Sequence, residues 1–204
     1  MKKLIFIGLL AVCAYKFYQF SYSKILLSKR PDTVQVFVGP GCEKLCADVE
    51  EELGSRKVKY EAIDISTPEG EKYGINTYPQ TRIGRQTVMG DDRNHIISAL
   101  AETYGSAVLT PIEQSAMKNH FDQNGKPVVV LYGTSWCGFC KNQRQYFADH
   151  GVSFVDLDVE TTPSAKFAYD VLQGNGYPLV YVGYRRFNGY KQQEILDAIA
   201  ELRS

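Results

Sequence analysis

The feature that most restricts the fold of this chain is an internal repeat with an offset of 99 positions, the separation of Pro79 from Pro178. The matching pairs include Tyr78 with Tyr177, Pro79 with Pro178, Gly84 with Gly183, Gly90 with Gly189, Ile96 with Ile195 and Ala99 with Ala198. Matches at glycines, at a Tyr-Pro pair and along a final helix are hard to obtain by chance. Because the period has the size of a domain, it indicates a tandem duplication rather than a solenoid.

Both copies have the same order of predicted elements. In the second copy, periodicity and breakers predict a strand at 128–132, a helix at 138–150, a strand at 153–159, a helix at 162–174, strands at 179–183 and 185–187, and a helix at 190–202. The first copy begins with a strand at 34–38 and a helix at 42–53, and continues in the same way to about residue 104. The sequence therefore predicts two α/β units of the order βαβαββα.

Two cysteines lie at the first strand-to-helix junction of the second copy, in the segment Gly133-Thr134-Ser135-Trp136-Cys137-Gly138-Phe139-Cys140. Cys137 is expected at the helix N-terminus, where unpaired backbone N–H groups and the helix dipole favour a thiolate. Cys140 lies nearly one turn further on, within reach of a disulfide. A structural zinc site needs two further ligands, whereas this half of the chain has no other cysteine and only His150. The spacing therefore favours a redox pair.

The first copy has a different spacing, Cys42-Glu43-Lys44-Leu45-Cys46. Residues four apart share a helix face, so Cys42 and Cys46 can form a disulfide if the first turn adjusts. Glu43 would disfavour a neighbouring thiolate by charge repulsion. Two interpretations stay open: an active redox pair with a different poise, and a degenerate structural copy.

Residues 1–22 differ in composition from the rest of the chain. Lys2 and Lys3 give a short positive start, and an apolar run follows to Tyr15, with an aromatic fringe at 17–22. We interpret this segment as a single membrane anchor, shorter in its apolar part than the ~20 residues that span a bilayer, with a cleaved signal peptide as the alternative. Charge bias does not fix the orientation, but a basic start before an apolar run is typical of export. The soluble part is therefore expected outside the cytoplasm, in the periplasm if the source is a bacterium.

The charge balance excludes an obvious nucleic-acid partner. Lys and Arg number 23 and so do Asp and Glu, and no basic stripe is present in the sequence. His95, His120 and His150 are scattered and are expected at the surface or at helix caps. Arg185 and Arg186 are expected in a solvated hairpin.

The segment 106–126 separates the two copies. Thr110, Pro111 and Glu113 have the pattern of a helix N-cap, first position and third position. A helix to about residue 121 is predicted, and it could be either a linker helix or the opening helix of the second domain.

The order of elements, the Cys-Gly-Phe-Cys motif and Tyr177-Pro178 ahead of the third strand resemble the glutaredoxins of the thioredoxin superfamily. The resemblance is close for residues 127–204, and 33–105 look like a divergent second copy. It implies that Cys137 is the attacking thiolate and Cys140 the resolving thiol, with Cys42 and Cys46 as their counterparts. It also implies a cis-proline at Pro178 that faces the cysteines. The implied substrate-binding residues are Trp136, Tyr177 and Pro178, with Tyr78 and Pro79 in the first copy.

The activity that this resemblance implies is thiol–disulfide exchange with protein disulfides or glutathione mixed disulfides. No bound cofactor is expected, and glutathione is a candidate co-substrate. Asn188-Gly189-Tyr190-Lys191 departs from the Gly-Gly-x-Asp-Asp of relatives with a strong glutathione site and is closer to thioredoxin-reducible relatives. The expected partners are protein thiols and disulfides, with glutathione or a thioredoxin-type protein as reductant.

Two other functional classes stay open at this stage. Cys-Gly-Phe-Cys is similar to the Cys-Gly-Phe-Ser of cluster-binding relatives, and thiolates bind soft metals, so a metal or iron–sulfur carrier is one alternative. A non-catalytic docking protein that uses thioredoxin folds is the other.

Overall fold

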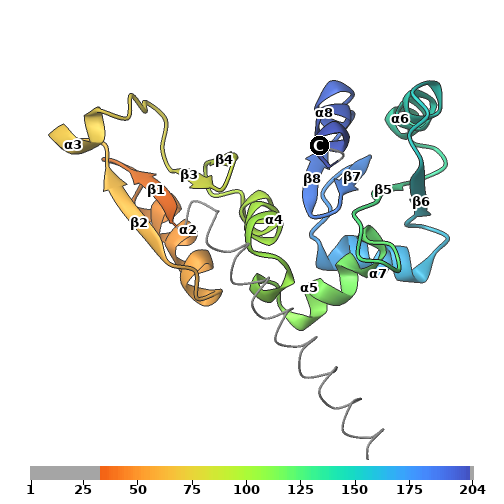
Figure 1. The fold of residues 1–204 in the computed structure, drawn as a ribbon, viewed down its shortest axis with the longest axis horizontal. Coiled ribbons are helices and arrows are strands. Elements are labelled where there is room, and N and C mark those ends of the chain that lie inside the picture. The colour runs from red at the N-terminus through yellow and green to blue at the C-terminus, as the bar shows by residue number, and fades with distance from the viewer. Residues whose placement is uncertain (1–32, 203–204) are drawn as a thin grey trace, which may run out of the picture.

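The computed structural model describes residues 33–202, which form two four-stranded sheets with helices against them (Figure 1). The predicted N-terminal anchor lies outside the described residues. Within 33–202, no helix combines the length and the apolar character needed to cross a membrane. The predicted α/β class with two similar sheets is confirmed, at residues 34–104 and 129–201.

The first unit has the predicted order of elements. Its elements are β1 (Val34–Val38), α2 (Glu43–Ser55), β2 (Tyr60–Asp64), α3 (Pro68–Glu71), β3 (Gln80–Ile83), β4 (Gln86–Met89) and α4 (Arg93–Tyr104). The strand order in the sheet is β2-β1-β3-β4. β1 and β2 are parallel, whereas β3 runs antiparallel to β1 and to β4.

The second unit repeats this arrangement with the strand order β6-β5-β7-β8. Its elements are β5 (Val129–Gly133), α6 (Gly138–Asp149), β6 (Phe154–Asp158), α7 (Pro163–Val171), β7 (Leu179–Val182), β8 (Arg185–Asn188) and α8 (Gln193–Glu201). The last helix starts three residues later than predicted. Residues 190–192 stay in the preceding loop, where the backbone N–H of Lys191 donates to Oε1 of Gln143 at 3.2 Å.

The segment between the sheets contains η1 (Ser106–Val108), α5 (Pro111–Ala116) and η2 (Met117–His120). The predicted helix start at Thr110 is confirmed. The Glu113 N–H donates to Thr110 Oγ1 at 3.3 Å, and the Thr110 N–H donates to Glu113 Oε2 at 2.8 Å, which is a complete capping box.

The two central strands of the second sheet, β5 and β7, are buried on both faces. On β5, Val129 and Leu131 face a core that α6 and α8 complete with Phe147 and Ile195. The alternate residues Val130 and Tyr132 face the other core, which also receives apolar side chains from α7 and α5. Because successive strand residues point to opposite faces, this continuous apolar run can fill two cores at once.

Helix α4 is shared between the two units (Figure 1). Ile96 and Leu100 pack into the core of the first sheet, whereas Ile97 and Ala101 join the core of the second unit. The helix is consequently apolar on two sides, and seven of its twelve residues are buried. Its aliphatic side chains thus pack the first unit against the second.

Ser98, on the same helix, makes hydrogen bonds to the backbone of β8 and of the turn before it, at the outer edge of the second sheet. Ser98 Oγ accepts from the backbone N–H of Arg186 on β8 at 3.0 Å and donates to the carbonyl of Tyr184. An outer strand otherwise exposes unpaired backbone groups to other chains. Ser98 therefore satisfies backbone groups that an isolated second unit would leave to solvent.

A buried ion pair fastens the first unit to the connecting segment. Arg56, just after α2, donates to both carboxylate oxygens of Glu113 at 2.8 and 2.9 Å, and the two side chains are only 4% and 8% exposed. Arg56 also donates to the carbonyl of Val108 at 2.7 Å and pairs with Glu52. A bidentate pair of this kind fixes geometry as well as charge.

Two polar residues that we expected at the surface are buried. His120 is fully buried, with Nε2 2.9 Å from the Tyr132 hydroxyl and Nδ1 3.1 Å from the Gly183 carbonyl. Burial lowers the pKa of His120 to about 3, so this imidazole is neutral at physiological pH. Arg186 is 3% exposed and donates to the carbonyl of Leu172 at 2.7 Å. Both expectations were wrong: His120 packs against Tyr132 and Tyr181 of the second sheet, and the Arg186 guanidinium is enclosed by the end of α7 and Tyr181.

The Arg56–Glu113 pair predicts a stability that depends on pH. Burial by itself would raise the pKa of Glu113, but hydrogen bonds from Arg56 and the Thr110 N–H, with the Arg56 charge, hold it down to about 2. The ionised carboxylate therefore stabilises the fold fully above its ordinary pKa of 4.5, and this contribution is lost as the pH falls from 4.5 towards 2.

We expect Glu113→Gln to lower the free energy of unfolding by roughly 1–3 kcal/mol at pH 7, since it weakens hydrogen bonds to a buried charge. Below pH 4.5 the difference from wild type should shrink. Urea unfolding from pH 2 to pH 7 measures both effects. Glu69→Gln is the control because this glutamate is exposed. A difference that stays constant across the whole pH range would contradict the assignment.

Candidate active site

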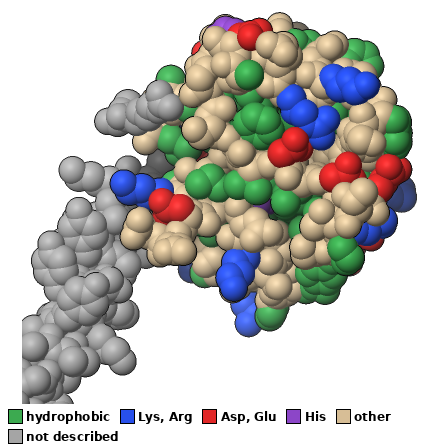
Figure 2. Space-filling model, turned by 90° about the vertical axis from the view of Figure 1, so that its right-hand side faces the viewer, with side chains coloured by type: hydrophobic (Ala, Val, Ile, Leu, Met, Phe, Trp, Pro, Cys, Tyr) green, Lys and Arg blue, Asp and Glu red, His purple; other side chains and the backbone are tan. Residues whose placement is uncertain are grey.

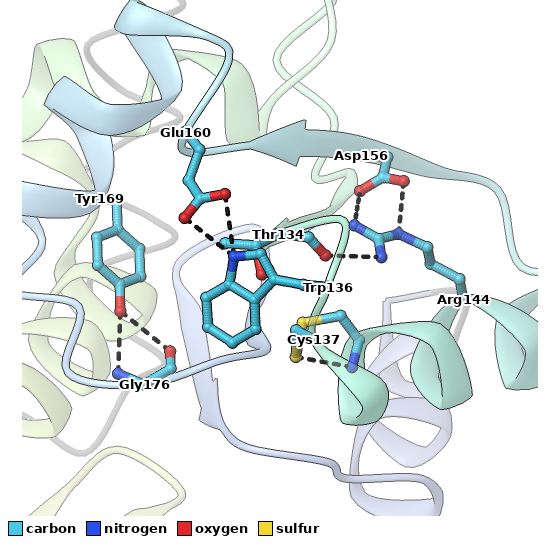
Figure 3. The surroundings of a disulfide bond; sticks show 9 residues. Thr134, Trp136, Cys137, Arg144, Asp156, Glu160, Tyr169 and Gly176 are labelled. Carbon is cyan, nitrogen blue, oxygen red and sulfur yellow. Dashed lines mark hydrogen bonds and ion pairs between the residues drawn. A yellow bond between two sulfur atoms is a disulfide. The ribbon is translucent and has the colours of Figure 1, made fainter.

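The second cysteine pair lies at the junction of β5 and α6, as predicted, and is disulfide-bonded (Figure 3). Cys137 is the N-cap of α6, and its Sγ accepts from the backbone N–H of Cys140 at 3.1 Å. The Cα atoms of the two cysteines are 5.2 Å apart. Cys137 is 6% exposed and Cys140 is fully buried. The helix end thus directs a backbone donor at the sulfur of Cys137, the more exposed cysteine of the pair.

The sulfur of the buried cysteine, Cys140, lies against Gly133. A Cβ on Gly133 would lie 2.9 Å from Cys140 Sγ and 3.3 Å from Nη2 of Arg144. Arg144 is held beside the cysteine pair by two bonds to Asp156, at 2.7 and 3.0 Å, and by a bond to the Thr134 carbonyl at 3.3 Å (Figure 3). Gly133 therefore leaves room for Cys140 Sγ, and the Arg144 guanidinium lies close to the same position.

Trp136 extends from the site into solvent and is held at its polar end. The side chain is 64% exposed, and its Nε1 lies 3.0 Å from each carboxylate oxygen of Glu160 (Figure 3). The ring of Tyr177 meets the indole edge-to-face at 6.0 Å. Sequence reasoning missed Glu160. It follows β6, and because β5 and β6 are parallel, residues after their C-terminal ends meet at one edge of the sheet.

The Tyr177–Pro178 peptide bond is cis, as the resemblance implied, and so is Tyr78–Pro79. In both copies the proline carbonyl accepts a backbone N–H at 2.8 Å, from Gly189 for Pro178 and from Gly90 for Pro79. The duplication has thus kept one backbone arrangement. The substrate-binding role of these residues stays a prediction.

A second aromatic pair lies on the helix side of the disulfide. Phe139, the residue before Cys140, is 62% exposed, and its ring stacks on that of Tyr190 at 6.4 Å. The sequence analysis did not select these two residues.

On the face drawn in Figure 2, Lys and Arg side chains lie among Asp and Glu side chains and do not gather into one basic patch.

The first cysteine pair, Cys42 and Cys46, is also disulfide-bonded, with Cα atoms 5.5 Å apart. Its surroundings differ from those of the second pair. Cys42 is the N-cap of α2, but no capping bond to its sulfur exists among the described residues. Glu43 follows directly, and its carboxylate accepts the Gly41 N–H at 3.3 Å. A negative charge therefore stands in the first turn, where the second site has Gly138.

Tyr78 and Tyr177 occupy equivalent positions but point to different partners. The Tyr78 hydroxyl donates to the Pro40 carbonyl at 2.9 Å, and its ring lies where a Cβ on Gly39 would be, within 2.8 Å. Tyr78 thus covers the turn that leads to Cys42, whereas Tyr177 packs on the exposed Trp136.

Within residues 33–202, no group of three or more His, Cys, Asp or Glu side chains is arranged to hold a metal ion.

Comparison with known proteins identifies the second unit. The glutaredoxin family model matches residues 129–186, from β5 into β8, and does not extend to the first unit. No curated protein matches the chain.

Several solved structures are similar to one unit of this chain. The glutaredoxin of Methanosarcina mazei Go1 is 22% identical, with 40% of this chain and 97% of that chain covered and a TM-score of 0.32. NrdH-redoxin from Escherichia coli is 20% identical over 34% of this chain and 91% of that chain, also at 0.32. The buckwheat glutaredoxin–glutathione complex is 14% identical over 44% and 78%, again at 0.32.

The Gly133 contact predicts that Gly133→Ala destabilises the oxidised protein by about 1–3 kcal/mol, because the new methyl group must displace Cys140 Sγ or the Leu131 side chain. Urea unfolding under non-reducing conditions measures the change. Gly138→Ala is the matched control, since a Cβ there meets nothing within 4 Å. Equal stability of Gly133→Ala and wild type would show that the close contact between Gly133 and Cys140 Sγ does not require glycine.

The two helix starts predict unequal thiol reactivity after full reduction. At neutral pH we expect iodoacetamide to label Cys137 about tenfold faster than Cys42, because a backbone N–H stabilises the Cys137 thiolate and Glu43 opposes that of Cys42. Mass spectrometry of the labelled peptides gives both rates from one sample. Glu43→Gln should accelerate Cys42 alone. Equal rates in the wild type would contradict the expected asymmetry.

Proposed function

Residues 129–186 are a glutaredoxin-family domain, and on this basis we infer that the protein is a thiol–disulfide oxidoreductase whose chemistry is carried by Cys137 and Cys140. The observation that carries the proposal is the position of Cys137. It is the outer cysteine of a pair at a helix N-terminus, with a backbone N–H directed at its sulfur at 3.1 Å. This arrangement stabilises a thiolate, which is the attacking species in disulfide exchange.

The reaction that we infer runs in two exchanges from the reduced protein. The Cys137 thiolate attacks one sulfur of a substrate disulfide, the substrate S–S bond breaks, and one substrate thiolate leaves. Cys140 then gives up its proton and attacks Cys137 Sγ, which releases the second substrate thiolate and forms the Cys137–Cys140 disulfide. Two electrons pass to the substrate, and an external thiol reductant must return them.

Three neighbouring groups would assist these two exchanges. Arg144 lies beside Cys140, where its positive charge would favour the thiolate that must form before resolution. The main chain of Tyr177, ahead of Pro178, would pair with the substrate chain as an added strand. Trp136 would cover the substrate next to the reacting sulfurs.

Glutathione and a thioredoxin-type protein are both candidate reductants. Glutathione is suggested by the family of residues 129–186 and by the buckwheat glutaredoxin solved as its complex. The membrane anchor in residues 1–22 and a location outside the cytoplasm remain proposals from the sequence. Cys42 and Cys46 are proposed as a second redox pair that is less easily activated than the first, on the grounds of Glu43 and Tyr78.

Substitution of the two cysteines tests this function. Cys137→Ser should abolish reduction of a protein disulfide such as insulin, whereas Cys140→Ala should retain attack and accumulate a mixed disulfide at Cys137. Turbidity measures insulin reduction, and non-reducing electrophoresis with mass spectrometry identifies the trapped partner. Cys46→Ala is the matched control in the first unit. Undiminished activity of Cys137→Ser would refute the assignment.

A further inference from the structure

We propose that the groove beside the Cys137–Cys140 disulfide selects polypeptide substrates that carry an arginine or lysine close to the reacting cysteine, in preference to glutathione. This inference rests on the disulfide exchange proposed above and adds the substrate class to it. Its basis is the shape, charge and aromatic character of one groove.

The groove has a volume of about 590 Å³ and is lined by Val159, Glu160, Pro163, Lys166 and Tyr177. A volume of this size is typical of sites that hold a small ligand or a few residues of a chain. Trp136 stands at its side. The indole N–H donates to Glu160 (Figure 3), and the indole packs on Tyr177; both residues line the groove. A substrate bound at Cys137 therefore lies next to this groove.

The lining of the groove carries one carboxylate, that of Glu160, and one cation, that of Lys166. The single cation of its lining, Lys166, donates to Asp170 at 2.6 Å, so its charge is compensated. Asp158 adds a carboxylate beside Glu160, where it accepts the N–H groups of Glu160 at 2.9 Å and Thr161 at 3.1 Å. These backbone bonds lower the pKa of Asp158, so the group is ionised at neutral pH. Glu160 itself is exposed to solvent.

The Glu160 carboxylate stands within reach of a substrate side chain. Trp136 is adjacent to Cys137 in sequence, and Glu160 accepts from the far, N–H end of the same indole (Figure 3). The carboxylate is thus separated from the disulfide by about one indole ring. An extended chain advances ~3.3 Å per residue, so a side chain within about three residues of the substrate cysteine can reach it.

A basic side chain would meet two matching features at this point. The face of Trp136 is open to solvent at 64% exposure and can stack with a guanidinium or ammonium group. Glu160 can pair with the same cation, and arginine can do so with two hydrogen bonds. Glutathione carries two carboxylates and one ammonium group, so the Glu160 carboxylate would repel its net negative charge.

Three disulfide probes with one leaving group test the selection. An arginine-flanked cysteine peptide, the corresponding glutamate-flanked peptide and glutathione are each converted to the mixed disulfide with 2-thiopyridine. The fully reduced full-length protein is mixed with each probe, and the release of pyridine-2-thione is followed by absorbance. The rate of the Cys137→Ser variant is subtracted, which removes the contribution of Cys13, Cys42 and Cys46.

The variants separate the groove charge from the position of the indole. Glu160→Gln keeps an acceptor for the Trp136 N–H but removes the charge, and Glu160→Lys reverses the charge. Glu51→Lys is the control. It changes the net charge as much as Glu160→Lys does, but on the exposed surface of α2, away from the groove.

We expect wild type to react about fivefold faster with the arginine peptide than with the other two probes, a preference that weakens at high ionic strength. The preference should fall in Glu160→Gln, reverse in Glu160→Lys and persist in Glu51→Lys. A wild-type rate no higher than that of Cys137→Ser for every probe would refute the exchange function itself. Active protein whose preference is the same in the Glu160 variants, or that prefers glutathione, would overturn the selection alone.

Discussion

The rest of the structure depends on the packing of α4 between two hydrophobic cores. Ile96 and Leu100 complete the core of the first sheet, while Ile97 and Ala101 complete that of the second. Burial of apolar surface is the main favourable term in folding, and here one helix contributes it to both units. The Ser98 bonds to β8 and the Arg56–Glu113 pair then fix the geometry that this packing creates. β8 pairs with β7, and β7 pairs with β5, the strand that leads to the disulfide.

The two cysteine sites show how a duplicated backbone can support different chemistry. Both copies keep a cis Tyr–Pro bond and the same carbonyl contact after it, at Pro79 and at Pro178. The side chains around the sulfurs have diverged. In the first copy, Glu43 and Tyr78 make hydrogen bonds to the turn that precedes the helix. In the second copy a glycine follows Cys137, and the rings of Trp136 and Phe139 are exposed to solvent.

The sequence analysis succeeded where the cause of a feature is local. The order of elements, the helix start at Thr110 and the position of Cys137 at a strand-to-helix junction depend on residues within a few positions of each other. It failed for His120 and Arg186, which are buried by segments far away in the chain. Glu160 was missed for the same reason, since its partner Trp136 is 24 residues distant and reaches it only when β5 and β6 pair in parallel. The roles of the site residues and the domain boundaries remain predictions.

The shared helix also changes how this chain can vary. In a simple tandem duplication, each copy accepts or rejects a substitution according to its own core. A substitution at Ile97 belongs to the first copy by position, yet its effect falls on the packing around Tyr132 and Tyr181 of the second. Mutations on α4 must therefore satisfy two cores together, so few will be neutral in both. Along α4 the two units therefore cannot vary independently of each other.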